Sequence, residues 1–399
     1  MIGYSDFMSR YIQKLKNLYH LFVAIVANLW YGFPSRRLKV IGVTGTDGKT
    51  TTTHLIYHIL KTAGKKVSMV SSVYAIVGKK EYDIGFHITT PNPFALQKLL
   101  KQSIVNGDEY FILETTSHAL DQFRVWGINY EVGVVTNITH EHLDYHQTFE
   151  DYVKTKAKLL LNSKMAVINE SDKSYQFLKK LVQSSKCKVQ SYNSKLKVLN
   201  QLSNLTEFNR CNYAAASLVC RKLGINEEII LKAMKVFKLP KGRLEVVYDK
   251  EFKIIIDFAH TPNAFENVLK AIKENYLNNS GRLIHVFGAA GLRDQSKRPL
   301  MGQVSGKYAD LIILTEEDYR TEDPEKICQQ IAEGIKDRQY LIIVDRQKAI
   351  GKAISLVKKN DIVILTGKSH EKSLCRGKTE YPWDEFEAAK TAISNLKTR

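Results

Sequence analysis

The chain has 399 residues, of which 44% are apolar and 25% charged, an ordinary soluble globular composition with length for two to three domains. The 59 Lys and Arg residues outnumber the 41 Asp and Glu residues and give a net charge of +18. These basic residues are spread along the whole chain without a long basic tract, which disfavours nucleic-acid binding. Five dispersed cysteines without a CxxC pair indicate reduced thiols in a cytoplasmic protein.

An apolar segment, Leu18–Tyr31, lies near the N-terminus with basic residues on both sides. It is too short for a membrane-spanning helix, which needs about 20 residues, and no signal-peptide cleavage site follows it. Two interpretations remain open. The segment is a helix docked on the protein's own body, or residues 11–35 lie on the inner membrane surface with Trp30 and Tyr31 near the interface.

A glycine-bearing loop follows. Residues 42–53 are GVTGTDGKTTTT, between an apolar strand and a helical stretch, and this arrangement cradles nucleotide phosphates. Lys49 is placed to reach the terminal phosphates and Thr50 to ligate Mg²⁺. The match to the general P-loop is imperfect, because that pattern has a glycine where Val43 stands. A plain glycine-rich turn is the alternative, but the flanking strand and helix favour ATP binding.

Apolar strands alternate with helices along the rest of the chain, which predicts an α/β fold with mostly parallel sheets covered on both faces. We expect strands at 39–43, 66–70, 110–114, 132–136 and 165–168, and helices at 54–63, 93–106, 148–161 and 212–223. Pro240 and Gly242 interrupt this pattern. It resumes with strands at 252–257, 283–287, 311–315, 340–344 and 361–366 and a helix at 263–274. We therefore expect an N-terminal apolar helix (1–37), a P-loop-type central ATPase domain (38–240) and a Rossmann-like α/β domain (241–399).

Polar clusters follow several strands of the central domain, at the edge where ligands collect in open parallel sheets. Glu114 ends one strand and is placed to hold a metal near the phosphates, although the Thr-Thr-Ser after it is also typical of a helix cap. The segment 136–146, TNITHEHLDYH, is the densest metal-competent one. Its three histidines predict either a Zn²⁺ site or one His that completes a Mg²⁺ shell. Lys154, Lys156 and Lys158 are typical of a solvated basic helix face.

Four polar loops follow strands in the second half of the chain. They are IDFAHTPNAF (256–265), GAAGLRDQSKRP (288–299), EEDYRTEDP (316–324) and GKSHE (367–371). Any one of them would be an ordinary connection between a strand and a helix. All four together, at the strand ends of one sheet, predict a binding face.

Together, these loops resemble the Mur ligase family, ATP-dependent amide-forming enzymes of peptidoglycan synthesis, and most closely its MurE type. The resemblance covers about residues 38–390 in the same order. It rests on TGTDGKTTT, TTP at 89–91, the E-x-x-SH run at 114–118, HLDYH at 142–146, GRLE at 242–245, DFAHTP, LRDQSKRPLM, EDP at 322–324 and GKSHE. The family has this shorter glycine pattern in its phosphate loop, so Val43 is not a departure from it.

The resemblance implies roles for residues of both domains. At the phosphates of ATP it implies Gly45, Thr46, Asp47, Gly48, Lys49, Thr50 and Thr51, and at the purine and ribose Asn209, Arg243, Asp257 and His260. For two Mg²⁺ ions it implies Thr50 and Glu114 at one and His142 at the other, with Lys156 carbamylated. Lys49, His142 and Lys156 are expected to be catalytic. For the muramyl dipeptide it implies Thr89, Thr90, Thr116, Gln122 and Arg124, and for the incoming amino acid Arg293, Asp318, Tyr319, Arg320, Gly367 and Glu371.

The implied reaction is amide formation. The γ-phosphate of ATP passes to a substrate carboxylate, and the amine of a diamino acid then attacks the acyl phosphate. Arg320 favours meso-diaminopimelate over lysine. The expected partners are a muramyl dipeptide and an amino acid, and we expect a cytoplasmic monomer, with membrane contact as the open alternative.

Three departures from the family pattern bear on these expectations. About 37 residues precede the first strand, where the family has a separate uridine-binding domain, so the uridine end is held differently or the substrate is a lipid-linked or altered muramyl peptide. The DNPR motif of diaminopimelate enzymes is replaced by the sequence EDYR at 317–320. GKGHE has Ser369 in place of its second glycine, and Glu141 replaces the Asp before His142.

Two alternatives remain. One is another ligase of this fold, such as a folate polyglutamate synthase or a cyanophycin-type enzyme, which TTP and HLDYH disfavour. The other is a non-catalytic nucleotide-binding scaffold for cell-wall enzymes. It is disfavoured because a scaffold has no need to keep Lys49, Thr50, Glu114, His142 and Lys156.

Overall fold

The computed structural model describes residues 4–85, 88–139, 141, 143–202, 205–277 and 280–397. The chain divides into two compact units, each described by itself below. The first comprises Met1–Ile138 and Thr148–Lys238, and the second comprises Thr139–Gln147 and Leu239–Arg399. Across the described residues, none of the helices is long and apolar enough to cross a membrane.

The first unit is built on an eight-stranded sheet in the order β4-β3-β2-β5-β1-β6-β7-β8. Its strands are β1 (Lys39–Thr44), β2 (Val67–Val70), β3 (Ala75–Val77), β4 (Lys80–Tyr82), β5 (Tyr110–Glu114), β6 (Tyr130–Val135), β7 (Ser163–Asn169) and β8 (Lys188–Tyr192). Six of them run parallel, and β3 and β4 add an antiparallel edge. The five strands predicted for this half are confirmed. The edge strands β3, β4 and β8 are too short or too polar to give a strand signal.

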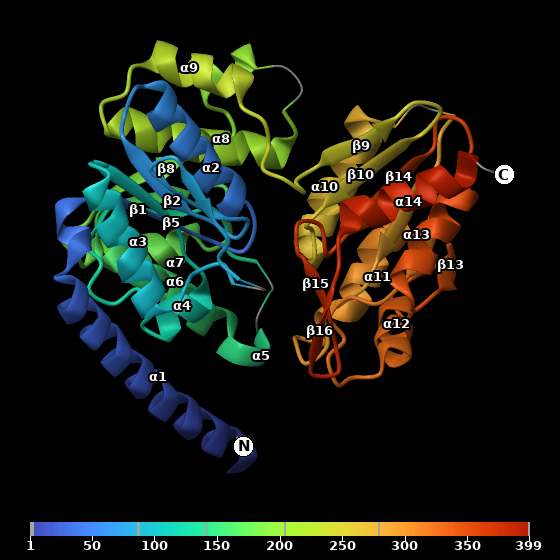
Figure 1. The fold of residues 1–399 in the computed structure, drawn as a ribbon, viewed down its shortest axis with the longest axis horizontal. Helices are drawn as coiled ribbons and strands as arrows, with labels where there is room; N and C mark the ends of the chain where they lie inside the picture. The colour runs from blue at the N-terminus through green and yellow to red at the C-terminus, as the bar shows by residue number, and fades with distance from the viewer. Residues whose placement is uncertain are drawn as a thin grey trace. The chain divides into compact units, whose positions relative to one another are not determined.

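Helices cover both faces of this sheet (Figure 1). One face carries α2 (Lys49–Thr62), α8 (Glu207–Lys222) and α9 (Glu227–Val236), whose apolar residues pack on alternate strand residues such as Ile41 and Val43. The other carries α3 (Pro93–Val105), α4 (Ser117–Asp121), α6 (Phe149–Leu161) and α7 (Tyr175–Gln183). Two short 3₁₀ helices, Pro34–Arg37 and Lys197–Gln201, complete the unit. Helix α2 begins five residues before the prediction, because its first turn belongs to the glycine loop.

The N-terminal helix α1 (Tyr4–Tyr31) has 28 residues, so the apolar segment predicted from the sequence is only its C-terminal half. It docks on the first unit beside α3 and α4. Asn28 Nδ2 donates to the carbonyl of Trp126 (2.9 Å), and Asn17 Nδ2 donates to Asp121 Oδ2 (2.9 Å). Six large apolar side chains remain solvent-exposed: Leu15, Leu18, Tyr19, Phe22, Leu29 and Trp30. One side of α1 is therefore docked and another is apolar and uncovered.

The second unit is built on a six-stranded sheet in the order β13-β12-β11-β14-β10-β9, parallel except for the edge strand β9. Its strands are β9 (Glu245–Asp249), β10 (Lys253–Asp257), β11 (Leu283–Phe287), β12 (Leu311–Leu314), β13 (Gln339–Ile342) and β14 (Ile362–Thr366), with a separate hairpin of β15 (Ser373–Arg376) and β16 (Thr379–Pro382). Its helices are α5 (Leu143–His146), α10 (Pro262–Asn275), α11 (Lys297–Tyr308), α12 (Pro324–Ala332), α13 (Arg346–Ser355) and α14 (Glu385–Lys397). The five predicted strands and the helix at 263–274 are confirmed, and the hairpin was not predicted.

Candidate active site

The phosphate loop connects β1 to α2, and two glycines shape it. Gly45 and Gly48 have φ angles of 150° and 79°, which favour glycine. A Cβ on Gly45 would lie 1.8 Å from Thr136 Oγ1, and one on Gly48 would lie 2.2 Å from Asn212 Oδ1. The loop also donates two backbone N–H groups to Asn137, from Thr46 N to its carbonyl and from Asp47 N to its Oδ1, both at 2.8 Å. These supports of the loop had no recognisable signal in the sequence.

Two lysines converge on this loop. Lys49 Nζ donates to the carbonyl oxygens of Gly45 (3.1 Å) and Thr46 (2.6 Å). Lys156 Nζ, on α6, donates to the same Gly45 carbonyl at 2.7 Å and lies 4.5 Å from the centre of the Tyr152 ring. The expectation that Lys156 belongs to a solvated helix face is wrong, because the side chain is 1% exposed. Two cations therefore lie where phosphate charge would collect.

Hard oxygen atoms gather beside the loop, around Glu114. Thr50 Oγ1 donates to Glu114 Oε1 (3.0 Å) and lies 2.9 Å from Ser72 Oγ. Ser72 N donates to Glu114 Oε2 at 2.9 Å. Glu114 is 1% exposed, and among the described residues no lysine or arginine forms an ion pair with it. A buried carboxylate and hydroxyls without a cation fit Mg²⁺, which prefers oxygen ligands. Ser72 had no recognisable sequence signal.

Four of the residues expected to hold the muramyl dipeptide form a connected chain next to Glu114. Thr90 Oγ1 donates to the Glu114 carbonyl (3.0 Å) and accepts from Thr116 N (3.1 Å). Arg124 Nη1 donates to the Thr90 carbonyl (3.3 Å), and its Nη2 donates to Gln122 Oε1 (2.7 Å). Thr89 is half-buried beside them in the chain.

The histidine-rich segment contributes less to the described structure. His140 and His142 lie outside the described residues, so neither the Zn²⁺ nor the Mg²⁺ interpretation can be placed there. Among the described residues, no group of three or more His, Cys, Asp or Glu side chains forms a metal site. Glu141, in the second unit, forms a buried ion pair with Lys297 Nζ at 3.0 Å.

The residues expected at the purine and ribose lie in different units. Asn209 lies on α8 of the first unit, where its Oδ1 accepts from Asn212 Nδ2 at 3.2 Å. In the second unit, Asp257 accepts from the backbone N–H groups of Leu244 (2.8 Å) and Ala259 (2.7 Å). Burial raises the pKa of Asp257, although the Arg243 guanidinium opposes this shift. Arg243 lies 4.7 Å from the centre of the Phe258 ring, which also lies 4.9 Å from the His260 ring and 4.8 Å from the His370 ring.

The loop after β12 carries three consecutive buried carboxylates, and two of them have cationic partners. Glu316 accepts from Arg376, with Nη2–Oε1 at 2.5 Å and Nε–Oε2 at 2.9 Å. Asp318 Oδ1 accepts from Lys368 Nζ at 2.9 Å, and Lys368 also pairs with Glu371 at 2.5 Å. Burial lowers the pKa of Lys368, but the two carboxylates outweigh it and raise the pKa. Asp318 is therefore held inside the unit by Lys368.

The hairpin β15–β16 fixes the neighbouring Arg320. Arg320 has a φ of 52°, unusual for a residue with a side chain. Its backbone N–H donates to the Cys375 carbonyl (3.1 Å), and its carbonyl accepts from Gly377 N (2.7 Å). Its Nη1 donates to the Gly291 carbonyl at 2.7 Å. Of the other residues expected at the incoming amino acid, Arg293 is exposed, Tyr319 is half-buried and Gly367 is buried.

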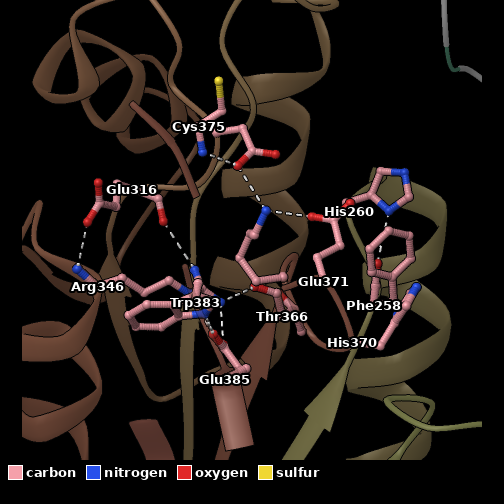
Figure 2. A network of polar contacts seen from close by, with 12 residues as sticks. Phe258, His260, Glu316, Arg346, Thr366, His370, Glu371, Cys375, Trp383 and Glu385 are labelled. Atoms are coloured by element: carbon pink, nitrogen blue, oxygen red, sulfur yellow. Dashed lines mark hydrogen bonds and ion pairs between the residues drawn. The ribbon is translucent and has the colours of Figure 1, made fainter. Parts of the chain in front are cut away.

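A second buried ion pair lies behind this loop (Figure 2). The fully buried Arg346 donates from Nε (2.9 Å) and Nη2 (2.5 Å) to Glu385, which also accepts from Trp383 Nε1 at 2.7 Å. Arg346 N donates to Glu316 Oε1 at 3.2 Å, and its Nη2 reaches the Thr366 carbonyl at 2.8 Å. This pair connects α13, α14 and the carboxyl ends of β12 and β14.

Comparisons with known proteins agree with this architecture. The family model for the Mur ligase middle domain matches residues 43–229, and that for the Mur ligase glutamate ligase domain matches 242–369. The chain is 40% identical to the UDP-N-acetylmuramoyl-L-alanyl-D-glutamate–2,6-diaminopimelate ligase of Aquifex aeolicus, over 92% of this chain and 80% of that one. It is 37% identical to the ligase of the same name from Caldanaerobacter subterraneus, over 93% and 81%.

Solved structures show the same fold. A 2,6-diaminopimelate ligase superposes with a TM-score of 0.59 and 29% identity, covering 90% of this chain and 79% of that one. A bifunctional folylpolyglutamate and dihydrofolate synthase from Yersinia pestis superposes with a TM-score of 0.71 at 18% identity, covering 94% and 95%, and shares the fold alone. The expected P-loop ATPase domain and Rossmann-like domain are confirmed. The chain belongs to the Mur ligase family, MurE type, and is an ATP-dependent ligase that forms an amide between an acid and an amino acid.

Proposed function

We propose that this ligase adds meso-diaminopimelate to the dipeptide of UDP-N-acetylmuramoyl-dipeptide, in peptidoglycan synthesis. The observation that carries the proposal is the convergence of Lys49 and Lys156 on the Gly45 carbonyl, beside the pair of Thr50 and Glu114. The Lys49 cation, the metal-competent oxygens of Thr50 and Glu114, and a lysine that can be carbamylated, all at one phosphate loop, suit the formation of an acyl phosphate intermediate. The curated relatives above carry diaminopimelate in their names.

In the proposed mechanism, the loop from Gly45 to Thr51 binds the phosphates of ATP through its backbone N–H groups and the N-terminus of α2. Lys49 moves from the loop carbonyls to the γ-phosphate and neutralises charge during its transfer. Thr50, Glu114 and His142 would hold two Mg²⁺ ions, which supply Lewis-acid stabilisation of the transferring phosphoryl group. Asn209, Arg243, Asp257 and His260 would bind the purine and ribose.

Lys156 is proposed to be carbamylated. An uncharged lysine amine can react with CO₂, and the resulting carbamate would offer two oxygens where the amine now offers only donors. Its burial, together with its position on the Gly45 carbonyl, supports this role, because the group would lie at the phosphate loop rather than in solvent.

The acceptor is proposed to lie along Thr89, Thr90, Thr116, Gln122 and Arg124, next to Glu114. In this arrangement the Arg124 guanidinium, positioned by the Thr90 carbonyl and Gln122, would bind an acidic group of the dipeptide. The incoming amino acid would contact Arg293, Tyr319, Arg320, Gly367 and Glu371. Arg320 would bind the second carboxylate that distinguishes diaminopimelate from lysine. Asp318, positioned by Lys368, would line the same pocket.

We also propose that α1 lies on an anionic membrane surface, and that the enzyme is a cytoplasmic monomer. Leu18, Phe22, Leu29 and Trp30 are each more than 60% exposed, and Lys16, Arg36 and Arg37 are exposed near them. Apolar side chains with basic neighbours are typical of interfacial helices. A variant with Ser or Asn at those four positions should no longer float with vesicles of anionic phospholipid, whereas the exposed control Val236→Ser should. Equal flotation of all three proteins would contradict the membrane contact.

Phosphate release tests the proposed function. Purified enzyme with Mg²⁺ and ATP should release phosphate only when the muramyl dipeptide and diaminopimelate are both present. Release with an acceptor of another class, such as a folate, and none with the muramyl dipeptide would contradict it.

A further inference from the structure

Glu317 differs from the two carboxylates that flank it after β12, which both pair with a basic side chain. Its neighbours are neutralised within the unit, Glu316 by Arg376 and Asp318 by Lys368. Among the described residues, Glu317 forms no ion pair, and its Oε2 has no hydrogen-bond partner. The side chain is nonetheless only 8% exposed. A buried carboxylate oxygen without a partner is costly and calls for a functional reason.

A glycine packs closely against this oxygen. Gly367, in the loop after β14, has a φ of 101°, and a Cβ there would lie 2.9 Å from Glu317 Oε2. Any larger residue would clash with the carboxylate and strain the backbone. Gly367 therefore covers Oε2 without offering it a hydrogen bond, and a small group from outside the protein can meet the carboxylate only at the small part of Glu317 that stays exposed.

Several charges act on Glu317. Burial raises the pKa of Glu317, and the carboxylates of Asp318 and Glu371 raise it further. Lys368 and His260 oppose this shift, and Arg346 also interacts with the Glu317 charge. Together, these effects raise the pKa of Glu317 above that of an ordinary glutamate.

We propose that Glu317 takes the proton from the ammonium group of the incoming amino acid. The inference rests on the proposed function, because that reaction needs a neutral amine. An N–H bond of the ammonium breaks, its electron pair stays on nitrogen as the attacking lone pair, and an O–H bond forms at the Glu317 carboxylate. Ammonium and carboxylate become amine and carboxylic acid, so the charge balances. Glu316, Asp318 and Glu371 cannot substitute, since each is already paired with Arg376 or Lys368.

The substitution Glu317→Gln tests this role in the full-length enzyme. It keeps the shape and removes the proton acceptor. We expect kcat with diaminopimelate to fall by about 100-fold at neutral pH, in the range typical of general-base catalysis. The deficit should shrink as the pH approaches the amine pKa, about 8 to 10, since more amine is then already neutral. The exposed control Glu333→Gln should retain wild-type kcat.

A reaction with hydroxylamine in place of the amino acid distinguishes a loss of proton transfer from a loss of fold as the cause of a lower kcat. Hydroxylamine is unprotonated at neutral pH, so its attack on the acyl phosphate needs no base. We expect Glu317→Gln to form the hydroxamate of the muramyl dipeptide at the wild-type rate. Loss of both reactions, an unchanged kcat with diaminopimelate, a deficit that does not depend on pH, or a raised KM with unchanged kcat would each overturn the proposal. Wild-type enzyme that joins no amino acid would instead overturn the proposed function.

Discussion

The candidate site residues of the first unit and those of the second unit are held in place by different kinds of groups. The phosphate loop is shaped by two glycines and held by backbone N–H, carbonyl and hydroxyl groups, and among the described residues Glu114 forms no ion pair. In the second unit, the loop after β12 is held by three basic residues, Arg376, Lys368 and Arg346, and by backbone hydrogen bonds of Arg320 to the hairpin. In the first unit, charged groups remain for ligands to bind. In the second unit, most of the buried carboxylates already pair with basic side chains of the protein.

This difference predicts different consequences of mutation. Mutation of the charged groups at the phosphate loop should lower turnover with little change in the free energy of unfolding, because these groups bind ligands rather than one another. Mutation of a buried ion pair in the second unit should destabilise that unit or displace its loops, because removal of one partner leaves the other charge buried and unpaired. The predictions below compare these responses, from the largest effect to the smallest.

The largest effect is expected at the fully buried pair of Arg346 and Glu385. Arg346→Met leaves the Glu385 carboxylate buried without its partner, at an expected cost of about 3–5 kcal/mol in the free energy of unfolding. Chemical denaturation monitored by Trp383 fluorescence would measure it. The exposed pair of Lys390 and Glu387 is the control, and Lys390→Ala should cost less than about 1 kcal/mol. Equal costs for the two variants would show that the buried pair does not hold the second unit.

At the phosphate loop, Glu114→Gln should act on turnover instead. It keeps the volume but removes the charge that would hold Mg²⁺, so we expect kcat to fall by about 100- to 1000-fold with little change in unfolding free energy. Glu131→Gln, which breaks only a partly exposed pair with Lys164, is the matched control. A Glu114→Gln enzyme with normal kcat and Mg²⁺ dependence would remove the metal role.

Lys156→Ala should lower turnover by about 100-fold, with partial recovery when short carboxylates such as acetate are added. Recovery would reflect replacement of the carbamate by an external carboxylate. The exposed Lys154→Ala on the same helix should have normal activity. Loss of turnover without any recovery would favour a purely structural lysine at the Gly45 carbonyl, and full activity would exclude the carbamate.

Arg376→Ala should raise the KM for diaminopimelate by about tenfold and leave the KM for ATP unchanged. We expect this because Arg376 positions Arg320: it neutralises Glu316 and lies on the hairpin strand that binds the Arg320 backbone. Arg376→Lys should recover part of the loss, since lysine keeps the charge but not the two-pronged geometry. A parallel rise in both KM values would indicate a general loss of structure.

The smallest effect, counted per pH unit, is expected in the pH dependence of the free energy of unfolding. Burial, with a contribution from Arg346, lowers the pKa of His285 to about 3, and the ring lies between Ser305 and Thr366 at 2.9 Å from each hydroxyl. Between pH 6.5 and about 3 the unfolded chain binds a proton that the folded one does not. Stability should therefore fall by about 1.4 kcal/mol per pH unit as the pH drops through this window. A His285→Gln variant should show a slope smaller by that amount, and an equal slope would contradict the assignment.

Sequence patterns predicted the phosphate loop well, because its geometry depends on local features. Glycines with positive φ, a lysine and a threonine at the start of a helix occur within ten residues of one another. The parallel strands were predicted for the same reason, since each is a short buried apolar run. Resemblance to a family, rather than spacing, was needed to separate Lys156 from Lys154 and Lys158, because burial against Tyr152 has no local signal.

The supports of the second unit could not be predicted from the sequence. Arg346 and Glu385 are separated by 39 residues, and Glu316 and Arg376 by 60. Nothing in the chain around them distinguishes a buried ion pair from two solvated side chains. The sequence also gave no indication that Asp318 pairs with Lys368, 50 residues away, or that Glu317, named only as part of the altered motif, keeps an oxygen without a hydrogen-bond partner.

The mass of the ligation product tests the proposed function most directly. Enzyme, ATP, Mg²⁺ and UDP-N-acetylmuramoyl-dipeptide would be incubated with a panel of amino acids, including meso-diaminopimelate, lysine and ornithine, and a parallel set would contain a lipid-linked muramyl dipeptide. We expect one amide product, with the mass of added diaminopimelate and at least tenfold preference over lysine. Joining of no amino acid to either acceptor would contradict the proposed function.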